Sequence, residues 1–237
     1  REPFRISERA VENIAEKTQI KMLEFKLKHN AHDTVTAAKR MWAAGCRTFI
    51  VLGGDGTNRI VARTCPDAVL LPISTGTNNV FPQMVEASVA GAAAGLICSG
   101  QVPIEENCYR CKQVHVECDD GTTDLALVDA ILLKNDQLGS LLPFSASNIS
   151  QIFLARSEAA SVGISPIGGF ILPCGAEDAF GVKLQCKEDA DLQLEVPISP
   201  GLYNTIGIES CNRVSLGEQT KVMGPGILAF DGDREIQ

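Results

Sequence analysis

Two glycine-containing polar stretches hold the residue types best suited to bind a phosphorylated ligand. The first, Gly53-Gly54-Asp55-Gly56-Thr57, directly follows a short apolar run, 48–52. Its glycines let the backbone turn sharply and approach a ligand closely, and backbone N–H groups in such a turn, backed by a helix N-terminus, attract phosphate oxygens. Because a carboxylate repels phosphate, Asp55 indicates either a ligand for Mg²⁺ or an acceptor for the proton of an attacking hydroxyl. The alternative is a tight turn in which Asp55 only caps a helix.

The second stretch, Ser74-Thr75-Gly76-Thr77-Asn78-Asn79, follows another apolar run, 68–73. Its hydroxyls and amides can hydrogen-bond a phosphate, a ribose or the edge of a base. If both apolar runs are buried parallel strands, both stretches lie at the carboxyl edge of one sheet, where open α/β sheets bind ligands. The alternative is a polar cap for a helix that begins after Pro82.

Helical and strand patterns alternate around these two stretches. Asp33 or Thr34 as a cap, and Gly45 as a stop, predict a helix over 33–44. The elements that follow are predicted as strand, helix, strand and helix over 48–52, 57–63, 68–73 and 83–98. The alternation indicates an α/β domain with a parallel sheet over residues 1–102. Residues 7–29 have only partly helical spacing.

After Pro103 the pattern changes to short strand-like segments separated by Gly, Pro and Asp. Strands are predicted over 112–117, 125–133, 151–155, 180–185, 192–196, 205–209 and 227–230. Asp119–Thr122 is a typical hairpin turn between the first two. These features predict a second, all-β domain over residues 103–237.

Composition excludes several classes of protein. The net charge is −8 without a basic stripe, so no nucleic-acid partner is expected. No run approaches the about 18 apolar residues of a membrane helix, so no integral membrane segment is expected. An odd number of cysteines, nine, and no signal-peptide pattern at the start of the sequence predict a reducing, cytoplasmic location without a disulfide framework.

Other catalytic and metal patterns are weak in this sequence. Cys108, Cys111, His115 and Cys118 are zinc-ligand types. However, they span a predicted strand, which points Cys111 and Cys118 to opposite faces. We therefore expect no dedicated protein metal site. Phosphate-loop, Rossmann and serine-hydrolase motifs are absent from the sequence.

The two glycine-containing stretches together resemble a known superfamily. Gly53–Thr57 resembles the signature shared by NAD kinases, diacylglycerol kinases and sphingosine kinases, and Pro72–Asn79 resembles their second nucleotide loop. The joint pattern is close to the acetoin-catabolism X proteins, a branch grouped with ATP–NAD kinases. The resemblance implies an α/β domain followed by a β-sandwich-like domain that completes the cleft. It also implies a homo-oligomer formed through the β-rich domain.

The resemblance assigns roles to individual residues. Asp55 would be the catalytic acid group, acting as general base or metal organiser, with ATP and Mg²⁺ as cofactors. The residues implied to bind the nucleotide are Gly53, Gly54, Gly56, Thr57, Asn58, Thr75, Gly76, Thr77, Asn78 and Asn79. Asp129, Asp231 and Asp233 are candidates for an acceptor or metal site, since Asp231-Gly232-Asp233 resembles the Asp-Gly-Glu element of the lipid kinases.

Two departures from the NAD kinase pattern keep the acceptor open. Val128-Asp129 stands where NAD kinases have an Asn-Glu or Asn-Asp pair, so the acid is kept and the amide is lost. Residues 159–163 lack the hydroxyl-rich loop of those enzymes. The sequence therefore predicts a kinase with a hydroxyl acceptor, which could be the 2′-hydroxyl of NAD. The alternatives are a lipid or small-metabolite kinase and a non-catalytic nucleotide-binding module of acetoin catabolism.

Overall fold

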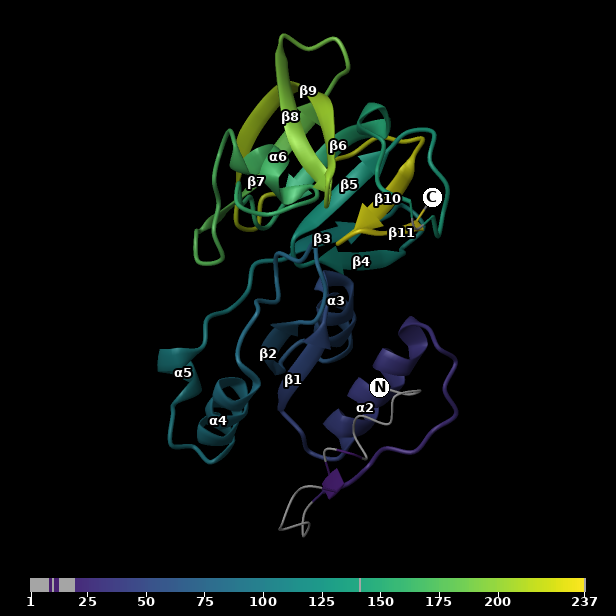
Figure 1. The fold of residues 1–237 in the computed structure, drawn as a ribbon. Helices are drawn as coiled ribbons and strands as arrows, with labels where there is room; N and C mark the ends of the chain where they lie inside the picture. Colours follow the sequence, from purple (N-terminus) through teal and green to yellow (C-terminus); the bar gives the residue numbers. More distant parts are fainter. Residues whose placement is uncertain (1–8, 10, 13–19, 141, 237) are drawn as a thin grey trace.

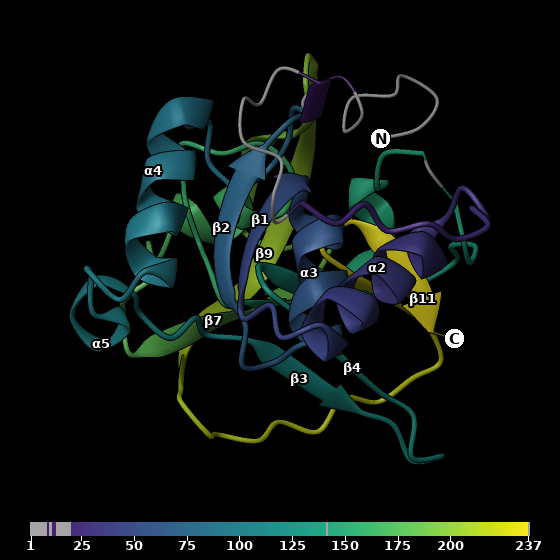
Figure 2. The same cartoon turned by 90° about the horizontal axis from the view of Figure 1, so that it is seen from below.

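The structure is a computed structural model, and it describes residues 9, 11–12, 20–140 and 142–236. The first part is a layered α/β unit (Figure 1). Its elements are α2 (Ala31–Ala43), β1 (Thr48–Gly53), α3 (Asp55–Thr64), β2 (Val69–Ser74) and α4 (Ala87–Cys98), and the short helix α5 (Ile104–Asn107) follows on the way to the second part. Helix α4 lies on one side of the β1–β2 pair, and α2 and α3 lie on the other (Figure 2).

The register of the two parallel strands fixes where the polar stretches lie. Strand β1 pairs with β2 from Thr48 opposite Val69 to Gly53 opposite Ser74. Gly53 and Ser74 are the last residues of their strands. Both polar stretches therefore leave the sheet at the same edge, as the sequence predicts.

The prediction that β1 is buried on both faces is wrong. Phe49 and Val51 are buried in a small core cluster with α2 and α3, whereas Ile50 and Leu52 are exposed. The reason is that successive side chains of a strand point to opposite faces, and only one face of β1 joins that cluster.

Several helix boundaries also differ from the predicted ones. Asn30, not Asp33 or Thr34, caps α2 by accepting the N–H of His32, while Asp33 accepts the N–H groups of Lys28 and His29. Helix α3 begins earlier than predicted, at Asp55. Helix α4 begins later, at Ala87, because the Glu86 carboxylate caps its first turn. The predicted pattern over 7–29 lies mostly outside the described residues, and residues 20–28 form no regular element.

The second part is a seven-stranded sheet in which every neighbouring pair is antiparallel, with strand order β11-β10-β5-β6-β7-β9-β8. Its strands and short helices are β5 (Asp129–Leu133), η1 (Ala146–Asn148), β6 (Ile149–Leu154), α6 (Ser165–Gly169), β7 (Phe180–Cys186), β8 (Leu192–Ser199), β9 (Leu202–Ser215), β10 (Ile227–Phe230) and β11 (Asp233–Ile236). A hairpin of β3 (Val114–Glu117) and β4 (Thr123–Ala126) precedes it. The predicted fold class, an α/β domain followed by an all-β domain, is confirmed.

The β3–β4 hairpin covers part of the sheet and makes the second part sandwich-like there. Val114 and Val116 of the hairpin pack against a cluster that contains Ala130 and Phe230. The larger apolar core lies elsewhere in the sheet, where Ile167 of α6 packs with residues such as Leu184. Helix α3 lies directly beneath the hairpin, which brings the two parts into contact (Figure 1).

One predicted strand, 125–133, is two strands in the structure. Strand β4 ends at Ala126 and β5 begins at Asp129. The Asp231 carboxylate accepts the backbone N–H groups of Leu127, Val128 and Asp129, at 2.9, 2.8 and 3.1 Å. Because these N–H groups bond to a side chain instead of a neighbouring strand, β4 and β5 are separate strands, and Asp129 lies close enough to Asp55 for their charges to interact.

None of the helices in the described ranges is long and apolar enough to cross a membrane. All nine cysteines, each of them described, are free.

Candidate functional site

A hollow of about 440 Å³ lies where the two parts meet. It collects residues from four separate segments of the chain. Those that the sequence predicts are Gly54, Asp55, Gly56, Thr57, Asn78, Asn79, Asp231 and Asp233. Four others also line it: Asn30, Ala31, Thr34 and Ile60. No lysine or arginine is among these lining residues, so the described wall of the hollow is polar and acidic.

The remaining predicted residues lie outside the lining. Gly53 is buried at the end of β1, and Asn58 is fully buried, where its amide donates to the Gly54 carbonyl at 2.9 Å. Thr75, Gly76 and Thr77 are exposed. Asp129 is buried behind the hollow.

The Asp55 carboxylate joins the two polar stretches. Its Oδ1 accepts the backbone N–H of Phe81 at 2.8 Å, and both of its oxygens accept that of Val80, at 3.2 and 3.1 Å. Asp55 is the first residue of α3, whose N-cap is Gly54. The carboxylate therefore does not serve as a simple helix cap. Instead, it holds the chain that follows the second stretch against the first.

Two glycines of the first stretch are needed because other groups approach them closely. A Cβ atom at Gly54 would lie 2.6 Å from the Asn79 Oδ1 atom, and one at Gly56 would lie 2.8 Å from the Asp233 Oδ2 atom. The Asn79 amide is fixed by donating to the Ser74 hydroxyl at 2.8 Å. The absence of a side chain at Gly54 thus lets Asn79 of the second stretch approach. The absence of one at Gly56 lets Asp233 approach.

A third segment, the turn 231–233, reaches the hollow from the second domain. Asp231 has a left-handed backbone, with φ of 49°, and its side chain is held by the three N–H groups at 127–129. Asp233 is half-exposed at the Gly56 side. Three carboxylates from distant parts of the sequence, Asp55, Asp231 and Asp233, therefore share one hollow.

Burial raises the pKa of every carboxyl in this group. Burial, opposed by the three N–H groups and assisted by the nearby charge of Asp55, raises the pKa of Asp231 to about 6. Burial and the charges of Asp231 and Asp55 raise the pKa of Asp129 well above its ordinary value of 3.8. Burial also raises the pKa of Asp55, against the lowering effects of the Phe81 and Val80 N–H groups and of Arg156.

Asp129 is the most confined of these carboxyls. Its side chain is buried, and its Oδ1 atom has no hydrogen-bond partner among the described residues. A buried, unpaired carboxylate oxygen beside two other acids costs free energy of folding. Its position therefore favours a role in the chemistry of the hollow over a role in stability.

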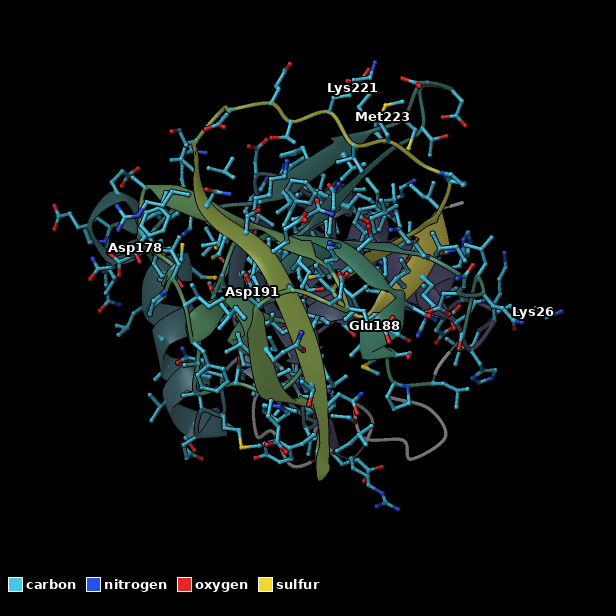
Figure 3. The ribbon with its side chains drawn as sticks, turned by 90° about the horizontal axis from the view of Figure 1, so that it is seen from above. Lys26, Asp178, Glu188, Asp191, Lys221 and Met223 are labelled. Carbon is cyan, nitrogen blue, oxygen red and sulfur yellow. The ribbon has the colours of Figure 1, made fainter. Side chains whose placement is uncertain are left out.

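Sequence reasoning missed the two cations nearest to this group. Arg156 lies two residues after the end of strand β6, which is the signal that could have identified it, and its guanidinium donates to the Val80 carbonyl at 3.2 Å. Arg59 is fully buried in α3 and pairs with acids of the second domain. Arg234 pairs with Asp136 at 3.0 Å. Lys221 lies on the outer side of the loop between β9 and β10, near Met223 (Figure 3).

The missed lining residues come from the start of α2. Asn30, its N-cap, and Thr34 in its first turn both line the hollow. This helix has 13 residues, and the N-terminus of a helix favours negative groups. The polar sequence 30–34 after an irregular segment is the signal that points to them.

Within the described residues, no group of three or more His, Cys, Asp and Glu side chains is arranged to hold a metal ion. The cysteines and the histidine at 108–118 are among these described residues. A metal ion in the hollow would therefore need ligands from a bound molecule as well as from the protein.

Comparison with known proteins agrees with this architecture. Residues 4–102 match the ATP-NAD kinase N-terminal domain, and residues 112–237 match the acetoin catabolism protein X C-terminal domain. Acetoin catabolism protein X of Cupriavidus necator is 32% identical over 221 residues, which is 90% of this chain and 62% of that protein. The chain thus spans less than two thirds of the length of this relative.

Fold and matches together define the class as NAD kinase-like, with an α/β domain followed by a large antiparallel sheet. Within this class, the chain belongs to the acetoin catabolism protein X family.

The raised pKa values predict that acid stabilises the fold in this region. A carboxyl with a folded pKa above 3.8 contributes stability that is complete below pH 3.8 and is lost as the pH rises through its folded pKa, about 6 for Asp231.

Asp129→Asn removes the carboxyl that is buried with an unpaired oxygen. It should therefore stabilise the protein at about pH 8, by roughly 1–3 kcal/mol, and flatten the pH dependence of stability. Urea unfolding from about pH 5 to about pH 8 measures this, with exposed Asp191→Asn as the control. A loss of stability at about pH 8, larger than that of the control, would contradict the account.

Proposed function

We propose that this chain is an ATP-dependent phosphotransferase that moves the γ-phosphoryl group of ATP to a hydroxyl acceptor. The observation that carries the proposal is the convergence of the Gly54–Thr57 turn, the Asn78–Asn79 segment and the 231–233 turn on one acidic hollow. The match of the first domain to the ATP-NAD kinase N-terminal domain supports ATP as donor and the 2′-hydroxyl of NAD as the first acceptor to test.

Asp55 is proposed as the general base. It accepts the proton of the acceptor hydroxyl as that oxygen forms a bond to the γ-phosphorus, and the bond from the γ-phosphorus to the bridging oxygen of ADP breaks. The backbone N–H groups at the start of α3 are next to Asp55 in the chain and can donate hydrogen bonds to phosphate oxygens. Phosphoryl transfer depends mainly on such positioning and on charge neutralisation.

The acidic wall fits a nucleotide that arrives with a divalent cation. Mg²⁺ bound to the nucleotide would neutralise its phosphates, and Asp231 and Asp233 are the carboxylates proposed to help hold the ion. Without the cation, a polyphosphate would face three carboxylates and no lining lysine or arginine. The residues present therefore fit Mg²⁺ as a partner of the nucleotide.

One observation favours a second candidate, a nucleotide-binding module without turnover. Both Asp55 oxygens accept backbone N–H groups, so the carboxylate also has a structural task. A lipid or small-metabolite acceptor is the remaining kinase alternative, because Val128 stands in place of the acceptor-binding amide.

Three further expectations stay proposals. We propose that the domains divide between residues 102 and 103, that the protein is cytoplasmic, and that the β-rich domain forms a homo-oligomer. No nucleic-acid partner is proposed, because the net charge is −8 without a basic stripe.

Asp55→Asn tests the proposed base directly. Asparagine keeps the size of the side chain and one accepting oxygen, but it cannot take up the hydroxyl proton. We therefore expect turnover to fall by about 100-fold or more, while Mg²⁺–ATP still binds. Product analysis after incubation with Mg²⁺–ATP and NAD measures this, since NADP should form with the parent protein only. Absence of NADP from a folded, ATP-binding parent would exclude NAD as acceptor. Equal turnover by both proteins would exclude Asp55 as base.

A second expectation concerns the cation. ATP with Mg²⁺ should raise the melting temperature more than ATP alone, because only the neutralised nucleotide suits the acidic hollow. Thermal unfolding with each ligand, and with Mg²⁺ alone as the control, measures this. An equal shift with and without Mg²⁺ would contradict the assigned role of the carboxylates.

The pH dependence of turnover reports the state of Asp55. Burial raises its pKa, so the acidic limb of the kcat/KM profile should lie above 3.8 and turnover should fall as the pH drops through it. The Arg156 charge lowers this pKa, so Arg156→Met should move the limb to higher pH. An unchanged limb in that variant would argue against Asp55 as the titrating group.

A further inference from the structure

Arg59 is a buried cation that connects the two domains. It lies one turn after Asp55 in α3, and its side chain is fully buried. Its Nη1 atom is 3.1 Å from the Asp124 Oδ2 atom, and its Nη2 atom is 3.4 Å from the Asp233 Oδ2 atom. Nη2 also pairs with Glu235. All three acids belong to the second domain, so this one side chain spans the junction between the domains.

The contacts of Arg59 lead directly to the lining of the hollow. The Asp233 Oδ2 atom that Arg59 approaches is the atom that a Cβ at Gly56 would meet at 2.8 Å. Asp231 lies at the start of the same turn. Whatever holds Asp233 therefore also sets how the 231–233 turn meets the Gly54–Thr57 turn.

The surroundings of Arg59 indicate a role beyond stability. Its Nε atom has no hydrogen-bond partner among the described residues, although the guanidinium is buried. A buried ion pair often contributes little net stability, because the cost of desolvating the two charges offsets their attraction. Apolar residues of similar volume can stabilise a fold equally well. A planar guanidinium with several fixed donors does, however, define geometry.

Arg63 provides a matched comparison on the same helix. It pairs with the same Asp124 Oδ2 atom, at 2.8 Å, but its side chain is 39% exposed. It is neither a lining residue of the hollow nor paired with Asp233 or Glu235. Arg63 thus shares the partner Asp124 with Arg59 but makes no ion pair with the 231–233 turn.

We propose that Arg59 is the positioning residue that fixes the 231–233 turn against the Gly54–Thr57 turn, so that the two domains form one nucleotide site. The part of this inference that concerns nucleotide rests on the proposed function. The part that concerns the geometry of the turn stands independently, because it depends only on the contacts of Arg59.

Two readouts test the proposal on Arg59→Met, Arg59→Lys and Arg63→Met. The first is hydrogen exchange, in which Arg59→Met should lose protection at 231–236 and 54–58 while β7 and β9 keep theirs. The second is Mg²⁺–ATP affinity, which should fall about 10- to 100-fold in Arg59→Met because the lining is displaced. Arg59→Lys should recover part of both, and Arg63→Met should change affinity less than about twofold.

The outcomes separate this inference from the proposed function. Unchanged exchange at 231–236 in a folded Arg59→Met, or equal effects of Arg59→Met and Arg63→Met, would overturn the positioning role. If the parent protein binds no Mg²⁺–ATP, the proposed function fails, and hydrogen exchange still decides the role of Arg59. If Arg59→Met does not fold, Asp233→Asn with Glu235→Gln removes the partners instead, and the same loss of protection at 231–236 is expected.

Discussion

The Asp55 carboxylate is the contact on which the candidate site depends. By accepting the N–H groups of Val80 and Phe81, it ties together two loops that leave parallel strands at the same edge. This single side chain therefore holds the two loops together in the lining of the hollow. The same bonds lower its pKa, while its burial raises it, so the carboxylate is held in place without losing its ability to accept a proton.

The second domain adds the carboxylates of Asp231 and Asp233 to a hollow that already contains the carboxylate of Asp55. Asp231 gives its oxygens to three N–H groups at 127–129, which interrupts a strand and places Asp129 beside Asp55. Arg59 and Arg156 offset part of this charge from outside the lining. Such a cluster of buried carboxyls costs free energy of folding, and perturbed carboxyls of this kind are typical of functional sites. The proposed phosphoryl-transfer function would use this charge to hold a cation beside the nucleotide.

Much of the fold could be predicted from the sequence, because the period of apolar residues changes at about residue 103. The Gly53–Thr57 turn and the 231–233 turn were also predictable, since glycine beside aspartate after a strand is a local signal. Arg59, Arg156, Asn30 and Thr34 were not identified, because their importance depends on contacts between distant segments. The break between β4 and β5 was hidden for the same reason, since its cause, Asp231, lies 102 to 104 residues further along the chain.

The most direct measurement of the central claim is phosphorus NMR of Mg²⁺–ATP with the parent protein and a panel of hydroxyl acceptors. The panel should include NAD, a diacylglycerol and small polyols, with Asp55→Asn as the comparison. We predict that the γ-phosphate signal is replaced by that of a new phosphate ester in the parent protein and persists in Asp55→Asn. Persistence of ATP with every acceptor, in a parent protein that binds Mg²⁺–ATP, would contradict catalysis and leave the nucleotide-binding module as the function.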